Sequence, residues 1–342
     1  MSYALCRFFL SRFFAAAIVT TPEAHPQHIH DGDISRLGGI AIFASAVWVV
    51  VLGWLAQLPM QVLLIVTASF LPAFLLSAAE DLWGRVGPFF RYAACFGSAL
   101  IAVLGFDVAI PRYDFGLLDS LIQVPVMSVI VASFCIAGVT QSFNIIDGKN
   151  GLAVGIAQVA LLASVVICWR AGLLDLAQQV LWLIGAILGF SVFNFPAARL
   201  FLGDSGAYFL GFCVAVVSVV LSQSIPDLSP WVFVVLAALP IFETLFTIMR
   251  RIIIEGTRFS DPDYLHLHSL LCVWLECRYE ASKLRANWLT TVILTLVSAG
   301  LAVLAVLLSD STSALQALCV GIMVAYLMAY AALRRALVAY DN

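Results

Sequence analysis

The segment Gln141-Ser-Phe-Asn-Ile-Ile-Asp-Gly-Lys-Asn-Gly-Leu-Ala-Val-Gly155 joins two strongly apolar runs, 124–137 and 152–169. It contains an acid, several carboxamides, a lysine and three glycines. If both runs span a bilayer, these polar groups lie at the membrane surface. If the segment is helical at its start, Asn144 and Asp147 share one face, because residues i and i+3 are neighbours on a helix. Such a pair could offer oxygen ligands to a divalent cation.

The composition of the whole chain agrees with a membrane location. Of its 342 residues, 63% are hydrophobic and only 11% are charged, whereas soluble domains carry roughly 25% charged residues. The long apolar runs predict an all-α polytopic membrane protein, since a barrel would alternate over segments of about ten residues. The eight cysteines are scattered without CxxC spacing, so they indicate neither a disulfide framework nor a zinc site. No basic stretch indicates a nucleic-acid partner.

Apolar runs of about 17–25 residues predict the membrane spans. The first run is the weakest because Arg7 and Arg12 interrupt it, and it is either a span or an amphipathic segment on the membrane surface. No repeat or linker divides the chain, so we expect one integral-membrane domain over 1–342. The eleven predicted spans are 3–20, 38–56, 61–79, 90–106, 123–141, 151–169, 177–195, 206–222, 231–249, 286–308 and 313–333.

Lysine and arginine are distributed unequally between the two sides of this arrangement. Thirteen of them lie in the connections after odd-numbered spans or in the C-terminus, and only Arg112 and Arg170 lie after even-numbered spans. Positive residues favour the cytoplasmic side. The odd connections and the C-terminus are therefore predicted to be cytoplasmic, and the N-terminus lies outside if the first run spans.

The other polar clusters fall on the same predicted side. They are Glu80-Asp81, the segment 141–155, Phe201-Leu-Gly-Asp204-Ser-Gly206, and the long connection 250–285 with its His266-Leu-His268. This gathering suits an enzyme that joins a water-soluble substrate to a lipid. The alternative, a transporter or flippase, would place polar groups near the midplane on broken helices. Glu243 is the chief intramembrane acid, and we expect it to face the bundle interior and to be either paired or functional.

Asp204 opens a predicted span between two glycines. Glycines let the backbone approach a ligand, and free N–H groups at a helix N-terminus attract phosphate. An acid at this position would repel phosphate unless a cation lay between them, so Asp204 together with a diphosphate implies Mg²⁺ or Mn²⁺. The simpler reading is that Asp204 is a helix N-cap. His266 and His268 share a side only if the backbone is extended there, and they could bind substrate phosphate or sugar.

Taken in order, these clusters resemble the polyprenyl-phosphate N-acetylhexosamine-1-phosphate transferases. The resemblance implies transfer of a sugar 1-phosphate from a UDP-sugar to undecaprenyl phosphate, with release of UMP and a need for Mg²⁺ or Mn²⁺. It also implies an active site on the cytoplasmic face of a bacterial inner membrane, and it is compatible with a homodimer. The matching pieces are Arg36-Leu-Gly-Gly39, Asn144 to Asp147-Gly, Asn150-Gly-Leu, Phe201 to Gly206, Pro240-Ile-Phe-Glu243-Thr and His266-Leu-His268.

Departures from the family pattern refine this expectation. Glu80-Asp81 stands where the family has paired aspartates, and Asn150 replaces a frequent aspartate of the third loop. The sequence around Glu80 and Asn150 resembles a branch tied to surface polysaccharide, such as lipopolysaccharide O-antigen, more than the enzyme that makes lipid I. A member that has lost catalysis and serves as an assembly partner is a further alternative. The retained acids Asp81, Asp147 and Asp204 argue against it.

The resemblance also implies roles for individual residues. Asp204 would be the principal metal ligand, with Asn144 as its helper. Asn150 and Phe201 would hold the uracil by carboxamide hydrogen bonds and ring stacking. The remaining expected site residues are Asp81, Asp147 and Glu80 as catalytic carboxylates, with Asp81 or Asp147 as a possible base, and Lys149, Arg251, His266 and His268 as substrate-binding residues. We also expect the connection 250–285 to influence which sugar is used.

Overall fold

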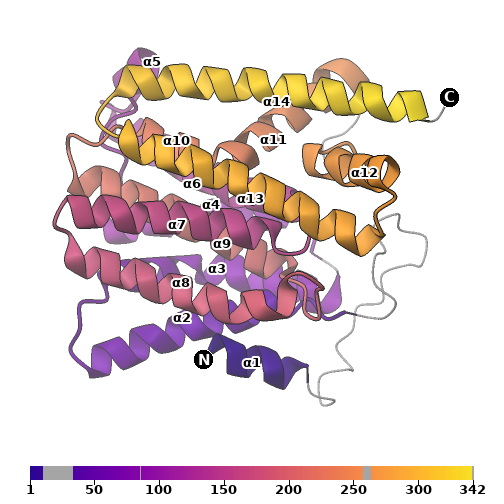
Figure 1. The fold of residues 1–342 in the computed structure, drawn as a ribbon. Helices are drawn as coiled ribbons and strands as arrows, with labels where there is room; N and C mark the ends of the chain where they lie inside the picture. Colours follow the sequence, from indigo (N-terminus) through magenta and orange to yellow (C-terminus); the bar gives the residue numbers. More distant parts are fainter. Residues whose placement is uncertain (11–33, 85, 257–262, 341–342) are drawn as a thin grey trace.

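The computed structural model describes residues 1–10, 34–84, 86–256 and 263–340, which form an all-α bundle (Figure 1). This confirms the predicted fold class. The helices are α1 (Ser2–Phe9), α2 (Gly38–Leu55), α3 (Gln61–Trp83), α4 (Pro88–Phe106), α5 (Gly116–Leu121), α6 (Pro125–Ile146), α7 (Leu152–Arg170), α8 (Leu174–Asn194), α9 (Gly203–Ser224), α10 (Trp231–Leu236), α11 (Ala238–Met249), the π-helix η2 (Arg250–Glu255), α12 (Leu267–Tyr279), α13 (Lys283–Leu307) and α14 (Thr312–Tyr340).

Nine helices in the described part of the chain are long and apolar enough to cross a membrane: α2, α3, α4, α6, α7, α8, α9, α13 and α14. They correspond to nine of the eleven predicted spans. The predicted span 231–249 is divided between α10 and α11 and continues into η2. The predicted span 3–20 includes α1 and ten residues that lie outside the described part.

The break between α10 and α11 has a local cause in the sequence. Pro240 lies in the first turn of α11 and has no N–H to donate to the carbonyl four residues earlier. A proline is tolerated in the first turn, where amides lack an intrahelical partner, but not in a helix interior. A helix therefore begins anew at Ala238 instead of continuing from α10.

Helix α9 lies at the centre of the bundle, with 94% of its apolar 18-residue window buried. It packs against α2, α3, α6 and α7. Glycines allow the closest of these approaches: a Cβ on Gly39 of α2 would lie 2.1 Å from the backbone nitrogen of Gly206, and one on Gly211 would lie 2.8 Å from the Cα of Thr140 in α6. Small residues at such positions are how membrane helices bring their backbones together.

The connections that carry the predicted motifs meet at one end of the bundle. The end of α6, the end of α8, the start of α9 and the start of α13 lie at the end of the molecule where α12 and the C-terminus are found (Figure 1). This arrangement agrees with the predicted alternation, in which the odd connections and the C-terminus share one side of the membrane.

Replacing Gly39 by alanine tests the backbone contact between α2 and α9. The added Cβ would clash with backbone that cannot move aside, and overpacking of this kind costs about 1–3 kcal/mol. We expect Gly39→Ala to lower the thermal unfolding temperature of the purified chain in detergent. Gly185→Ala in α8 is the matched control, because its Cβ would meet no atom within 4 Å. Equal unfolding temperatures for the two variants would contradict this view of the helix contact.

Candidate functional site

A cavity of about 230 Å³ lies where the motif-bearing connections meet. It is enclosed by the end of α6 and the turn that follows it, the end of α8, the start of α9, the start of α13 and the segment before α2. Six of the eleven predicted site residues line it: Asn144, Asp147, Lys149, Asn150, Phe201 and Asp204. The other lining residues are Arg36, Gly148, Asn194, Leu202, Gly203 and Asn287.

The end of α6 contributes the first two oxygen-bearing side chains. Asn144 lies in the last turn, where its Nδ2 donates to the hydroxyl of Tyr208 on α9 at 3.0 Å. Helix α6 ends at Ile146, and Asp147 follows as its C-cap. Burial, together with repulsion from the Asp81 carboxylate, raises the pKa of Asp147 to about 7. Asn144 and Asp147 both line the cavity, so the two side chains share one surface there, as their spacing predicted.

The start of α9 is held by an acid from another helix. The carboxylate of Asp81, only 2% exposed on α3, accepts the Asp204 N–H at 2.8 Å, and it accepts the Ser205 N–H at 2.9 Å and the Ser205 hydroxyl at 2.6 Å. Asp81 thus serves as an N-cap contributed by a distant helix. Gly203 has a φ of +74° and lies close to the Asp81 carboxylate: a Cβ added at this position would be 2.7 Å from Asp81 Oδ2. The N–H groups of Asp204 and Ser205 are therefore already used by Asp81 and are not free to bind phosphate.

The Asp204 carboxylate forms an ion pair with Arg91, which lies near the start of α4. Both side chains are less than one-fifth exposed, so the guanidinium offsets a negative charge in a poorly solvated place. Arg91 was not among the predicted site residues. The contact spans 113 positions in the chain, and no local pattern indicates it.

The side chains that line the cavity could supply some, but not all, of the oxygen ligands of a magnesium ion. Mg²⁺ is usually bound by one or two carboxylates, and water and substrate phosphates complete its coordination. Asp204, Asn144 and Asp147 supply such a limited set of ligands. Over the described residues, no group of three or more His, Cys, Asp or Glu side chains is arranged to hold a metal by itself. A metal here would therefore depend on oxygen atoms of the substrate.

The turn after α6 is fixed by three asparagines. The Asn150 N–H donates to Asn287 Oδ1 at 3.1 Å, and Asn150 Nδ2 donates to the Pro196 carbonyl at 3.1 Å. The next amide, of Gly151, donates to Asn194 Oδ1 at 2.6 Å. Asn194 and Asn287 were not predicted as site residues. Asn194 directly precedes Phe195-Pro196 at the end of an apolar run, which is a usable signal, whereas Asn287 has none.

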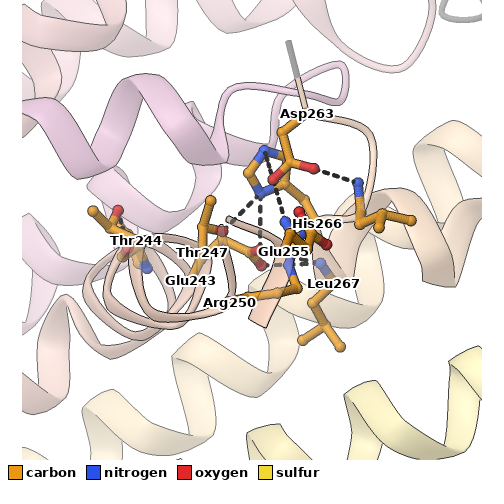
Figure 2. A network of polar contacts seen from close by, with 10 residues as sticks. Glu243, Thr244, Thr247, Arg250, Glu255, Asp263, His266 and Leu267 are labelled. Atoms are coloured by element: carbon orange, nitrogen blue, oxygen red, sulfur yellow. Dashed lines mark hydrogen bonds and ion pairs between the residues drawn. The ribbon is translucent and has the colours of Figure 1, made fainter. Parts of the chain in front are cut away.

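A second polar network joins Glu243 to His266 of the predicted histidine motif (Figure 2). Glu243, 1% exposed, lies 3.0 Å from Nδ1 of His266 and accepts the Leu267 N–H. Asp263 lies 3.6 Å from Nε2 of the same histidine and forms an ion pair with Arg250. Glu243 therefore faces the interior as expected, and of the two alternatives expected for it the structure shows the paired one. The network ties α11 and η2 to the start of α12.

His266 and His268 stack on each other, with ring centroids 5.3 Å apart and planes inclined by 6°. His268 is 1% exposed and packs against the turn after α6, where a Cβ on Gly148 would lie 2.1 Å from His268 Nε2. Burial, together with the neighbouring His266 and Lys149, lowers the pKa of His268 well below its usual value. A neutral His268 therefore supports the cavity wall from behind.

The remaining predicted site residues also lie outside the cavity wall. Glu80 accepts the Val86 N–H at 2.6 Å and so closes the turn after α3. Arg251 lies at the start of η2 and is 5% exposed. The structure therefore brings six of the predicted residues to one cavity, and it places Asp81, Glu80, Arg251 and the two histidines in the surrounding layer.

Comparison with known proteins finds similar membrane-lipid phosphotransferases. Residues 62–222 match the family described as Glycosyl transferase family 4. The chain is 27% identical to a probable undecaprenyl-phosphate N-acetylglucosaminyl 1-phosphate transferase of Bacillus subtilis, over 75% of this chain and 71% of that protein. It is 28% identical to a decaprenyl-phosphate N-acetylglucosaminephosphotransferase of Mycobacterium tuberculosis, over 76% and 70%. It is 26% identical to a phospho-N-acetylmuramoyl-pentapeptide-transferase of Shouchella clausii, over 79% and 90%. These findings confirm the resemblance predicted from the motifs.

Replacing Asp81 by asparagine tests its position at the start of α9. The new amide group would face N–H donors in a buried place, and an unsatisfied buried group costs about 1–3 kcal/mol. We expect Asp81→Asn to lower the unfolding temperature of the chain. Asp147→Asn, in the cavity wall, should leave that temperature nearly unchanged. The interpretation is contradicted if Asp81→Asn is as stable as the unmodified chain.

Proposed function

We propose that this chain, which is similar to polyprenyl-phosphate N-acetylhexosamine-1-phosphate transferases, transfers a sugar 1-phosphate from a UDP-sugar to undecaprenyl phosphate and releases UMP. The observation that carries the proposal is the cavity itself. Residues from motifs far apart in the chain, among them Asn144, Asp147, Lys149 and Asp204, meet there beside cationic groups. That combination of acids, carboxamides and cations suits a diphosphate substrate.

The proposed reaction is a phosphoryl transfer between two anions. An oxygen of the lipid phosphate attacks the sugar-bearing phosphorus of the UDP-sugar, and the bond from that phosphorus to the bridging oxygen breaks, so that UMP leaves with the oxygen. The second pKa of a phosphate monoester is about 6, so the attacking group is largely dianionic at neutral pH. A strong general base is hardly needed, and the main task is to offset the repulsion between the reactants.

The chain's own residues would meet this task in different ways. Asp204 and Asn144 would hold Mg²⁺ or Mn²⁺, which when bound neutralises charge that develops on the phosphate oxygens. Lys149 and Arg36 line the same cavity and would contact phosphate oxygens directly. Arg91, which forms an ion pair with Asp204, would offset part of the charge of that carboxylate. Asp147, with a pKa of about 7, could take up a proton near neutral pH.

In this scheme Asp81, Glu80 and the histidines would not contact the substrate and would instead position the residues that do. Asp81 positions Asp204 through the first turn of α9, and the stacked histidines support the turn after α6 from behind. Arg251 lies beside the Glu243 network at the start of η2. We further propose that the product starts a cell-surface polysaccharide, as the departures at Glu80 and Asn150 suggest.

The direct experiment incubates membranes that contain the chain with a panel of radiolabelled UDP-sugars and undecaprenyl phosphate, then extracts the lipid fraction. The proposal predicts that label from a UDP-N-acetylhexosamine enters the lipid and that UMP is released in equal amount. No labelled lipid with any sugar of the panel, from a chain that is present and folded, would contradict it.

Asp204→Asn tests the metal role. Loss of a group that stabilises charge in the transition state should reduce turnover by about 10²-fold or more, and binding of Mn²⁺, measured by electron paramagnetic resonance, should weaken as well. Asp175→Asn, an exposed acid in the first turn of α8, is the control and should change neither quantity. Undiminished turnover of Asp204→Asn, or full activity in excess EDTA, would contradict the proposal that Asp204 holds a metal ion needed for the reaction.

The side of the membrane is tested with single cysteines in a background from which all eight native cysteines are removed. We propose that the cavity end is cytoplasmic. A cysteine at Lys283, at the start of α13, should then resist an impermeant thiol reagent in intact cells, whereas one at Asp310, beyond the other end of α13, should react. Labelling with the reverse pattern would overturn the orientation.

A further inference from the structure

Asn287 is a polar residue to which neither the motifs nor the family match gives a role. It lies near the start of α13, outside the matched residues 62–222. Its side chain is 1% exposed and yet forms part of the cavity wall. A buried carboxamide in a membrane protein is costly unless its hydrogen-bonding groups are used, so each end of this side chain needs a partner.

The two ends of the Asn287 side chain are used differently. Its Oδ1 accepts the N–H of Asn150 at 3.1 Å, whereas nothing in the described part of the chain accepts a hydrogen bond from its Nδ2. Asn194, which lines the same cavity, uses both ends: its Oδ1 accepts from Gly151, and its Nδ2 donates to the Leu200 carbonyl at 3.0 Å. Asn287 therefore brings an unused N–H₂ donor to the cavity wall.

The orientation of this amide is fixed by its neighbour. A backbone N–H can only donate, so the Asn150 amide requires the oxygen of Asn287 and not its nitrogen. Rotating the carboxamide by half a turn would place two donors against each other and lose the 3.1 Å bond. The group that faces the cavity is thus a donor that cannot become an acceptor, and it can satisfy only an acceptor on a ligand.

The place of Asn287 in the fold indicates which part of a ligand it meets. The oxygen atoms suited to a metal and a diphosphate belong to α6, α9 and the turn after α6. Asn287 enters from α13, which packs mainly against α7, α10 and α12, and it contacts the turn at Asn150. Asn287 is therefore placed to donate to a neutral acceptor of the donor nucleotide, while the charged groups of the cavity would hold the diphosphate.

We propose that the Asn287 amide donates a hydrogen bond to the carbonyl oxygen at position 4 of the uracil base and so selects uridine over cytidine nucleotides. The proposal rests on the proposed function, in which the donor is a UDP-sugar. Uracil presents a carbonyl oxygen at position 4, whereas cytosine presents an amino group, which would meet the fixed donor of Asn287 without a partner. A site that leaves a buried polar group unpaired rejects the wrong ligand strongly.

The variant Asn287→Asp tests this role separately from the structural one. The carboxylate keeps an oxygen to accept the Asn150 N–H, so the turn stays held, but it replaces the donor at the cavity with an acceptor. We expect the variant to bind UMP about tenfold more weakly or worse, and to bind CMP no more weakly than the unmodified chain does. Dissociation constants from calorimetry on the purified full chain would measure both.

Thr291→Val is the matched control for the structural role. The Thr291 hydroxyl donates to the Asn150 carbonyl at 2.8 Å, so its loss loosens the same turn without changing the donor at the cavity. A loosened turn should affect UMP and CMP alike. If Asn287→Asp binds UMP as the unmodified chain does, or weakens both nucleotides equally, the proposal is overturned.

A measurement on the unmodified chain keeps the proposal testable should the variant fail to fold. In 4-thiouridine monophosphate, sulfur, a weaker acceptor, replaces the oxygen at position 4, and this ligand should bind more weakly than UMP. Equal affinity for the two would contradict the contact. If the unmodified chain binds no uridine nucleotide, the proposed donor class itself fails, and that result is distinct from a failure of Asn287 alone.

Discussion

The hydrogen bonds from the start of α9 to Asp81 are the interaction on which the site depends. A carboxylate that is 2% exposed inside a helical bundle would be very costly alone. Here it accepts two backbone amides and a hydroxyl at the N-terminus of the most deeply buried spanning helix, where the helix dipole also favours a negative charge. Because one of those amides belongs to Asp204, the same contact fixes the residue that we propose as the metal ligand.

The position of α9 explains how the motifs meet. Its glycine-lined contacts with α2 and α6 hold their ends close to its own start, so the turn after α6 and the segment before α2 enclose a single cavity. Around this cavity, Asn194 and Asn287 hold the turn from α8 and α13, and the Glu243 and histidine network supports it from α11 and α12. The site is therefore built at the ends of rigid helices, which keeps its oxygen atoms in fixed places.

Hydrophobic length and motif order could be read from the sequence because both are local properties. Apolar runs predicted the nine long helices, and the motif residues Asn144, Asp147 and Asp204 all line one cavity. The break before α11 was missed, although Pro240 offered a signal. The pairing of Arg91 with Asp204 and that of Asn150 with Asn287 join residues 113 and 137 positions apart, so only packing of the whole bundle shows them. For the same reason, the sequence could not show that Asp81 points at α9 and not into the cavity.

The central claim is that the cavity at the start of α9 binds the metal and the diphosphate together. Crystals grown with Mn²⁺ and UDP-N-acetylglucosamine would test it through the anomalous scattering of manganese. The account predicts a single strong peak in the cavity, about 2.0–2.2 Å from a carboxylate oxygen of Asp204, with the nucleotide beside it. A manganese peak elsewhere, or a bound nucleotide with Asp204 still paired only with Arg91, would contradict it.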